Sequence, residues 1–205
     1  VNLNVYKIIF MKFRILLFIL FSYSPTFASD IFDYEMDGIS IGNSLLDHYS
    51  YSEITSSDIY EYPGSNRFYD IFILSDQSSL YENYSITVKL NDDNYIIYAI
   101  SGEIVFNYQI EKCFNQKNSV INEIKNEIPN AKQLDYEWQY TELADGQSMA
   151  YITEFELNSG SIRVYCVNSS DKAKKSLNFP DYFALELTTH EVLDWLTYEA
   201  NTGQN

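Results

Sequence analysis

The stretch Tyr95–Ile128, YIIYAISGEIVFNYQIEKCFNQKNSVINEIKNEI, combines the two periodicities from which we predict the fold. Its first part, Tyr95–Ser101, is rich in β-branched and aromatic residues, which favour a strand. Gly102 follows and predicts a break at the end of that strand. Beyond it, apolar side chains recur at helical spacing, at Ile110, Cys113, Phe114, Ile121, Ile124 and Ile128. This pattern predicts an amphipathic helix that ends before Pro129.

Strand patterns flank this stretch on both sides. Tyr84–Leu90 precedes it across Asn91-Asp92-Asp93-Asn94, which has the length and composition of a hairpin loop, so antiparallel pairing is expected. Further strands are predicted at Arg67–Leu74, Asp135–Leu143, Ser148–Leu157, Ser161–Asn168 and Tyr182–Leu187. We therefore predict a single α+β domain, an antiparallel β-sheet with helices packed on one face. The order of elements also allows two similar α/β halves, although the halves share no recognisable residue identity.

Shorter elements are predicted from local signals. A helix is expected over about Asn43–Ser50, where apolar residues recur at helical spacing. Thr188-Thr189-His190-Glu191 matches a capping box, which predicts Thr188 as the cap of a C-terminal helix and Glu191 as its reciprocal partner. The polar segments Tyr51–Asn66 and Ser169–Pro180 are predicted to be loops.

The N-terminal residues have the pattern of a secretory signal. Met11-Lys12-Phe13-Arg14 precedes the apolar run Ile15–Phe21, and the small residues Thr26 and Ala28 precede a cut after Ala28. The apolar run is shorter than the roughly 20 residues that cross a bilayer, so cleavage is expected instead of stable membrane insertion. We predict that 1–28 is an N-terminal extension and signal peptide with Met11 as the true start. Residues 29–205 then form one secreted or periplasmic domain.

The chain is strongly acidic. It has 29 acidic and 13 basic residues, a formal net charge of −16, and loss of residues 1–28 removes three basic residues and no acid, which gives −19. This charge argues against a nucleic-acid partner, because phosphate neutralisation requires a basic surface. The hydrophobic content of 46% allows a packed core and argues against disorder.

Cys113 and Cys166 are the two cysteines of the chain. In an exported protein, two cysteines with no third to compete are most simply a structural disulfide. Both stand on apolar faces of their predicted helix and strand, so a bond between them would lie in the space between these layers. Two free buried thiols are the alternative, and redox catalysis is disfavoured because the chain has no C-x-x-C motif.

No catalytic, cofactor-binding or metal site is predicted from the sequence. His190-Glu191-Val192-Leu193-Asp194 lacks the second imidazole of a zinc-protease helix, and no G-x-S-x-G elbow is present. A hydrolase acting on glycans or peptides remains the alternative, because adjacent predicted strands carry Asp135, Glu137, Glu154 and Glu156.

Tyrosines are frequent along the chain. Five of them surround one predicted loop, namely Tyr49, Tyr51, Tyr60, Tyr62 and Tyr69. Tyrosine supplies a large contact area at a small entropic cost, so this group is a candidate binding face. The other interpretation is ordinary half-buried packing, since 19 tyrosines are spread over the whole sequence.

Five segments, GISIGNSLLDHYS, YAISG, IEKCFNQKNSVINEI, IRVYCVN and EVLDWL, resemble an uncharacterised family of small exported bacterial proteins. The resemblance covers nearly the whole mature chain and implies a bacterial, periplasmic setting, but no activity, ligand or cofactor. The sequence thus favours a non-enzymatic domain of the periplasm or cell envelope, which binds or modulates an envelope protein or a small ligand.

Overall fold

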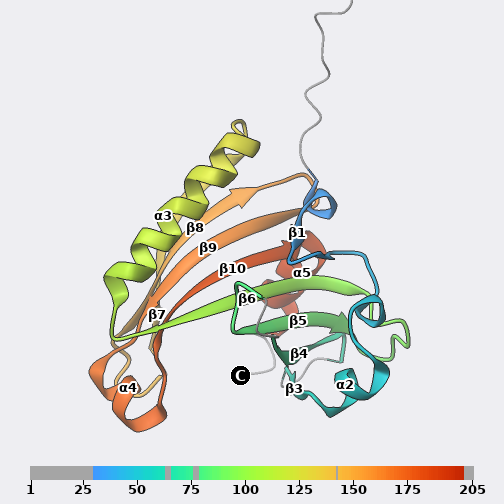
Figure 1. The fold of residues 1–205 in the computed structure, drawn as a ribbon, viewed down its shortest axis with the longest axis horizontal. Coiled ribbons are helices and arrows are strands. Elements are labelled where there is room, and N and C mark those ends of the chain that lie inside the picture. The colour runs from blue at the N-terminus through green and yellow to red at the C-terminus, as the bar shows by residue number, and fades with distance from the viewer. Residues whose placement is uncertain (1–29, 63–65, 76–78, 142, 201–205) are drawn as a thin grey trace, which may run out of the picture.

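An eight-stranded antiparallel sheet forms the body of the protein in the computed structural model, which describes residues 30–62, 66–75, 79–141 and 143–200 (Figure 1). The predicted signal segment 1–28, with Met11, lies outside the described residues. The strands of the sheet are β3 (Asp58–Glu61), β4 (Phe68–Leu74), β5 (Asn83–Lys89), β6 (Ile97–Asn107), β7 (Lys132–Tyr140), β8 (Ser148–Glu156), β9 (Gly160–Asn168) and β10 (Asp181–Thr189).

The helical elements are η1 (Ile31–Asp33), η2 (Leu45–Asp47), α2 (Tyr51–Ser56), α3 (Ile110–Glu127), α4 (Asp171–Leu177), α5 (His190–Trp195) and η3 (Leu196–Ala200). A separate two-stranded hairpin is formed by β1 (Glu35–Met36) and β2 (Ile39–Ser40). The predicted α+β class is confirmed, and so is the antiparallel β5–β6 pair.

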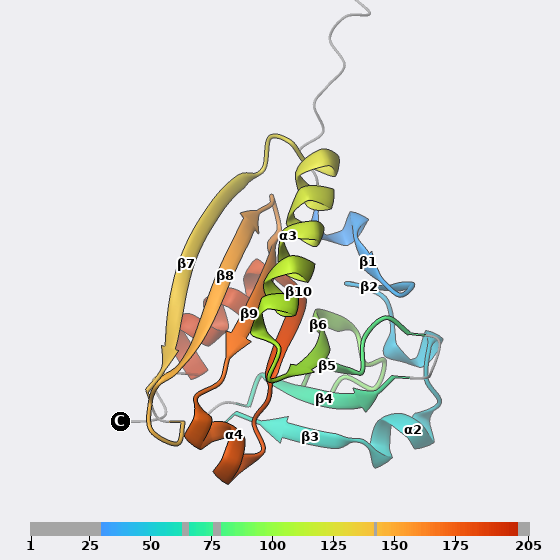
Figure 2. The same cartoon turned by 60° about the vertical axis from the view of Figure 1, so that its left-hand side comes forward.

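The strand order is β3-β4-β5-β6-β10-β9-β8-β7, so the sheet consists of two four-stranded meanders that meet where β6 pairs with β10. Each meander is preceded by a helix, α2 or α3, which is the order expected of two similar halves. The sheet is strongly twisted, and β3 and β4 run across the direction of β7 and β8 (Figure 2).

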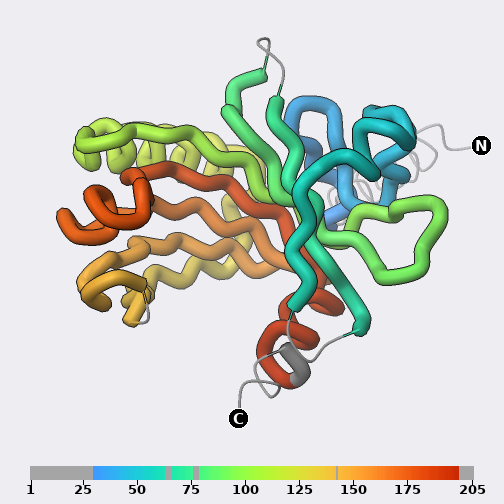
Figure 3. Tube along the Cα trace, turned by 90° about the horizontal axis from the view of Figure 1, so that it is seen from below, coloured from blue at the N-terminus to red at the C-terminus, as the bar shows by residue number. Residues whose placement is uncertain are grey.

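Helices cover the two faces of the sheet unequally. The long helix α3 packs on β9, β10 and β6, whereas α5 packs on the opposite face (Figures 2 and 3). Successive side chains of β6 point to opposite faces of the sheet. Ile100 belongs to the main core, which α3 covers, whereas its neighbour Ala99 packs with Val192 and Trp195 of α5. The prediction that helices pack on one face of the sheet is correct for α3. The helix α5 in addition covers part of the other face.

The predicted disulfide is confirmed. Cys113 of α3 and Cys166 of β9 are bonded, with their Cα atoms 5.9 Å apart, and both side chains are fully buried in the main core. The helix meets the sheet here because the apolar stripe of α3 faces inward, with Ile121 and Ile124 also buried.

Gly102 lies inside β6 and does not end the strand, so the predicted break is wrong. A Cβ atom at this position would lie 2.6 Å from Met36 Sδ and 2.7 Å from the ring of Tyr81. The glycine therefore allows these side chains to pack directly on the strand backbone. The strand continues to Asn107, which displaces the link to α3 to Tyr108 and Gln109.

The prediction of a helix over about Asn43–Ser50 is also wrong. Only the short turn η2 forms there, and α2 begins at Tyr51 inside the predicted loop Tyr51–Asn66. A capping box starts α2: the Ser50 hydroxyl accepts a bond from the Glu53 amide at 3.3 Å, and the Glu53 carboxylate accepts one from the Ser50 amide at 2.8 Å.

The predicted loop Ser169–Pro180 contains α4. The hydroxyl of Ser170 caps this helix by accepting a bond from the Ala173 amide. Lys174 of α4 lies 2.8 Å from the carboxylate of Asp181 at the start of β10, where the Lys174 side chain is 10% and the Asp181 side chain 1% exposed. This ion pair attaches the short helix to the end of the sheet, a contact between segments that local composition does not reveal.

Candidate functional site

Helix α5 begins one residue later than predicted. Thr189, not Thr188, caps it by accepting a bond from the Val192 amide at 3.4 Å. Thr188 is still part of β10 and donates to Glu186 at 2.6 Å. Glu191 therefore does not close the predicted capping box but binds two cations from the sheet.

Those cations are Arg67 and Lys89, each 2.9 Å from the Glu191 carboxylate. Burial alone would raise the pKa of Glu191, but the hydrogen bonds from Lys89 and Arg67 outweigh it, and the pKa lies below its ordinary value. The two ion pairs hold the first turn of α5 against β4 and β5.

Trp195 attaches the other end of α5. Its side chain is 1% exposed, and its ring lies 5.0 Å from the ring of Phe68 and 4.7 Å from that of Tyr62, measured between centroids. Trp195 belongs to a small second core, which is separate from the main core and consists of Phe68, Ala99, Val192 and Trp195. Because α5 is short and contacts only part of the sheet face, an open volume remains beside it.

This volume, which we call the α5-side cavity, is about 310 Å³. Its size is at the lower end of the range for small-molecule sites. Five strands and the C-terminal helical segment contribute to its wall, which is lined by Tyr62, Asp70, Phe72, Ser85, Thr87, Ala99, Ile100, Ser101, Glu103, Arg163, Tyr165, Glu186, Thr188, Val192 and Leu196.

Arg163 stands between two carboxylates on this face. Its Nε lies 3.3 Å from Glu154 Oε1 and its Nη1 lies 3.5 Å from Glu186 Oε1. The Nε is buried and makes no hydrogen bond of good geometry, so its contact with Glu154 is electrostatic. Tyr136 donates to Glu154 at 2.8 Å and Thr188 donates to Glu186. One guanidinium stands against two carboxylates, so Arg163 balances the charge of only one of the two glutamates.

Two further carboxyls in the wall have no ion pair with a described residue. Asp70 is 8% exposed and accepts bonds from Tyr62 at 2.7 Å and Thr87 at 2.6 Å. Burial raises the pKa of Asp70, and these two bonds oppose the shift only in part. Burial likewise raises the pKa of Glu103, which accepts one bond from Asn83 at 3.1 Å. The cavity therefore has polar groups that the protein itself does not fully neutralise.

Aromatic side chains continue the cavity wall toward the far end of the sheet. The rings of Tyr165 and Tyr182 lie 6.3 Å apart, and Tyr182 is 5.8 Å from Phe179. Burial raises the pKa of Tyr165 and of Tyr182 well above its ordinary value. Both phenols thus remain neutral hydroxyls that can donate hydrogen bonds.

The four carboxylates suggested by the sequence do not converge. In the β7–β8 ladder, Asp135 lies opposite Thr153 while Glu154 lies opposite Leu134, so Asp135 and Glu154 project to different faces. Glu137 shares the face of Asp135, and Glu156 shares that of Glu154 but pairs with Lys132 at 2.9 Å. Among these four, Glu154 alone contacts Arg163.

The five tyrosines that surround the predicted loop do not form one binding face either. Tyr62 lines the α5-side cavity, whereas Tyr69 packs against the main core on the other side of the sheet. Tyr51 and Tyr60 are exposed, and Tyr49 borders a different hollow.

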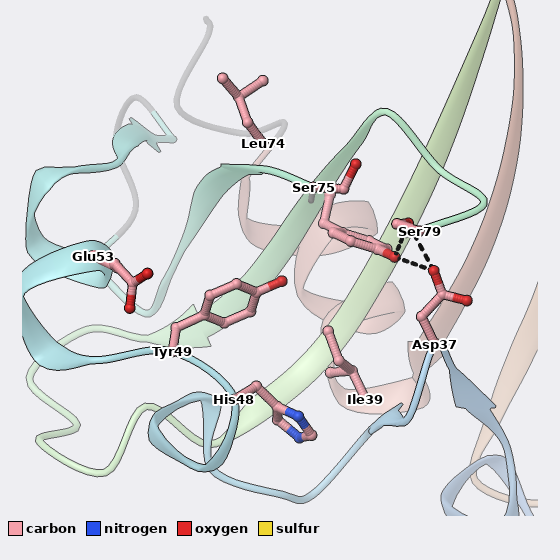
Figure 4. Close-up of a pocket in the computed structure, with 9 residues that line it drawn as sticks. Asp37, Ile39, His48, Tyr49, Glu53, Leu74, Ser75 and Ser79 are labelled. Carbon is pink, nitrogen blue, oxygen red and sulfur yellow. Dashed lines mark hydrogen bonds between the residues drawn. The ribbon is translucent and has the colours of Figure 1, made fainter. Parts of the chain in front are cut away.

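That second hollow, of about 580 Å³, lies between the N-terminal turns and the end of β4 (Figure 4). On one side, Asp37 accepts bonds from Tyr84 at 2.6 Å and from Ser79 at 2.7 Å. Glu53 and Tyr49 lie across the hollow from them (Figure 4). Since Asp37, Ser79 and Tyr84 bind one another, this hollow presents fewer unsatisfied groups than the α5-side cavity.

Comparisons with protein-family models, with curated proteins and with solved structures find no match to this chain. In the described part of the chain, no helix is both long and apolar enough to span a membrane. Function is therefore inferred from the geometry of the site.

Sequence reasoning did not single out Asp70, Glu103, Arg163 or Glu186 as site residues. One signal was available, because Asp70 stands in the apolar strand RFYDIFIL, where a charged residue is expensive unless it has a partner or a role. The convergence of the other three depends on strand order, since β6, β9 and β10 are adjacent only in the folded sheet.

Proposed function

We propose that the protein is an exported, non-enzymatic domain that binds a small organic ligand in the α5-side cavity. The observation that carries this proposal is the position of Asp70 and Glu103, two largely buried carboxyls without an ion pair to a described residue, in the wall of an open volume of about 310 Å³. Such groups lower stability unless something compensates them, and a ligand is able to do so.

The wall defines the kind of ligand. Asp70, Glu103 and the hydroxyls of Ser85 and Ser101 offer hydrogen-bond acceptors on the strands. The helical segment adds the apolar side chains of Val192 and Leu196, and Phe72 adds a further apolar side chain beside Ser85 on the strands. A molecule with hydrogen-bond donors on one side and an apolar body on the other fits this division.

The disulfide supports the export part of the proposal. Structural disulfides persist in oxidising compartments, and Cys113 and Cys166 are bonded and buried. Export through the predicted signal 1–28 would place the domain in such a compartment. Mass spectrometry of the protein recovered from the periplasm tests this, and a mature chain beginning at Ser29 is the expected result.

A thermal-shift screen with amines, amino acids, sugars and short peptides tests the cavity. We expect at least one compound to raise the Tm of the wild-type protein. Ser101→Leu fills the cavity and should abolish that shift, whereas Ser119→Leu makes the same change on the exposed side of α3 and should preserve it. A compound that stabilises all three proteins equally binds elsewhere, and a screen without any binder contradicts the proposal.

A carboxylate-dependent hydrolase of glycans or peptides is the second candidate. It is favoured by one observation, namely that Asp70, Glu103 and Glu186 line the same cavity. Hydrolysis of a glycosidic bond requires two carboxyls in different protonation states. Turnover of a glycan or peptide that Asp70→Asn or Glu103→Gln abolishes, without loss of folding, would replace the binding proposal with this one.

A further inference from the structure

The outer edge of β7 is long and unpaired. β7 is the last strand of the sheet and pairs only with β8, over an unbroken register from Lys132↔Glu156 to Tyr140↔Ser148 (Figure 2). Among the described residues, no strand pairs with its other side. The opposite edge of the sheet, β3, is only 4 residues long, whereas β7 has 9. Natural proteins usually shorten, bend or cover such an edge, so β7 is a candidate interaction site.

The two faces of β7 differ in chemistry. Leu134, Tyr136 and Trp138 share one face and are 37%, 36% and 61% exposed. The other face has polar and acidic residues, among them Asp135 and Glu137. A strand added at this edge would therefore meet an apolar stripe on one face and carboxylates on the other.

The acids of β7 are not equally balanced by neighbouring groups. A hydrogen bond from Thr153, helped by the charges of Lys117 and Lys125 of α3, holds the pKa of Asp135 below its ordinary value. Glu137 forms no ion pair with another described residue. Glu137 is thus the charge on this edge that an incoming strand would find unbalanced.

A second copy of the chain is a poor occupant of this edge. Antiparallel pairing of two β7 strands about Tyr136 would place Asp135 opposite Glu137 twice, and like charges directly opposite one another are destabilising. Each chain also has a formal charge of −16. A partner with a basic residue opposite Glu137 would instead form an attractive charge pair across the strands.

We propose that the β7 edge binds, as a ninth strand, an extended segment of a partner protein. In this segment a Lys or Arg lies opposite Glu137, and alternate residues are apolar and cover Leu134, Tyr136 and Trp138. Main-chain hydrogen bonds supply affinity in this mode of recognition, and the alternating side chains supply specificity. No residue of β7 lines the α5-side cavity, and binding at this edge does not require a ligand there.

The test uses three capped synthetic peptides and the folded, disulfide-bonded protein. KVTVKVTVK has the expected alternation, EVTVEVTVE reverses its charge, and VVVVKKKTT keeps the composition of the first without the alternation. Binding is followed by the fluorescence of exposed Trp138 and by amide hydrogen exchange of β7. We expect KVTVKVTVK to bind more tightly than both other peptides and to slow exchange in β7.

Charge reversal on the protein gives the matched control. Glu137→Lys should reduce the preference for KVTVKVTVK over EVTVEVTVE by about tenfold, since it turns an attraction across the strands into a repulsion. Glu127→Lys makes the same change in charge on an exposed position of α3 and should leave the preference unchanged. If Glu137→Lys lowers the Tm, Glu137→Gln is used instead, with a smaller reduction expected.

Several results would overturn the proposal. Equal binding of the alternating and the rearranged basic peptides would show that only net charge matters, and so would equal effects of the two lysine variants. Unchanged exchange in β7 at saturating peptide would place the contact elsewhere. A solution dimer whose formation protects β7 would identify a second copy as the occupant.

Discussion

Asp70 illustrates how a single residue links stability to the proposed site. It lies between Tyr69 and Ile71 in β4, and the alternation of the strand turns it away from the main core and into the α5-side cavity. Its bonds to Tyr62 and Thr87 fix the carboxyl in place, but the pKa remains raised by burial. The charged form of Asp70 thus lowers the stability of the folded state.

Asp70→Asn should therefore stabilise the ligand-free protein at pH 7, by about 1 kcal/mol. Burial raises the pKa of Asp70 in the folded state above the unfolded value of about 3.9. The wild type therefore loses stability as the pH rises from about 4 through the folded-state pKa. The amide of the variant does not titrate, and the difference should vanish below about pH 4. Urea unfolding at several pH values measures this, with Asp93→Asn in the exposed β5–β6 loop as control. A variant less stable than wild type at pH 7 would contradict the prediction.

At the scale of elements, α3 and β9 are joined by both packing and a covalent bond. The apolar stripe of α3 is long enough to be recognised in the sequence, and it buries Cys113 directly over Cys166. The short helices α2 and α4 have no such stripe. Each begins at an N-cap and buries one apolar side chain, Ile54 or Ala173, and α4 is held in addition by the ion pair of Lys174 with Asp181.

The disulfide should contribute substantially to stability because it closes a long loop. Cys113 and Cys166 are separated by 53 residues, for which the chain-entropy model gives about 4 kcal/mol. The double variant Cys113→Ala/Cys166→Ala should lower the free energy of unfolding by about this amount, as measured by urea denaturation. Reduced wild-type protein is the control and should behave similarly. An unchanged midpoint would show that packing of α3 alone determines stability here.

At the scale of the whole molecule, the pairing of β6 with β10 joins the two meanders into one sheet. Both strands have neighbours on each side, and α3 and α5 cover parts of their opposite faces. The edges β3 and β7 have one neighbour each among the described strands. Stability is therefore expected to decrease from the centre of the sheet toward its edges.

Native-state amide hydrogen exchange should show this gradient directly. We expect the slowest exchange in β6 and β10, and exchange at least about tenfold faster in β3 and β7, because edge strands open without unfolding the centre. In urea near the unfolding midpoint the differences should disappear, since global unfolding then dominates. Protection of free β7 equal to that of β10 would indicate that its edge is already covered.

The sequence by itself determined the class of the fold, the long helix, the hairpin and the disulfide. These depend on local periodicity over long segments and on the simple pairing of two cysteines. It misplaced the start of α5 by one residue and missed α2, β3 and α4, because short elements depend on caps and on contacts with distant segments.

Only the tertiary structure decided where function is to be sought. Strand order brings Asp70, Glu103, Arg163 and Glu186 together from four strands, and no spacing along the chain encodes that meeting. The register of β7 with β8 separates Asp135 from Glu154, which are near in the ladder but on opposite faces. A strand directs alternate residues to opposite sides, so which residues share a site depends on how the strands align, and that is set by packing of the whole sheet.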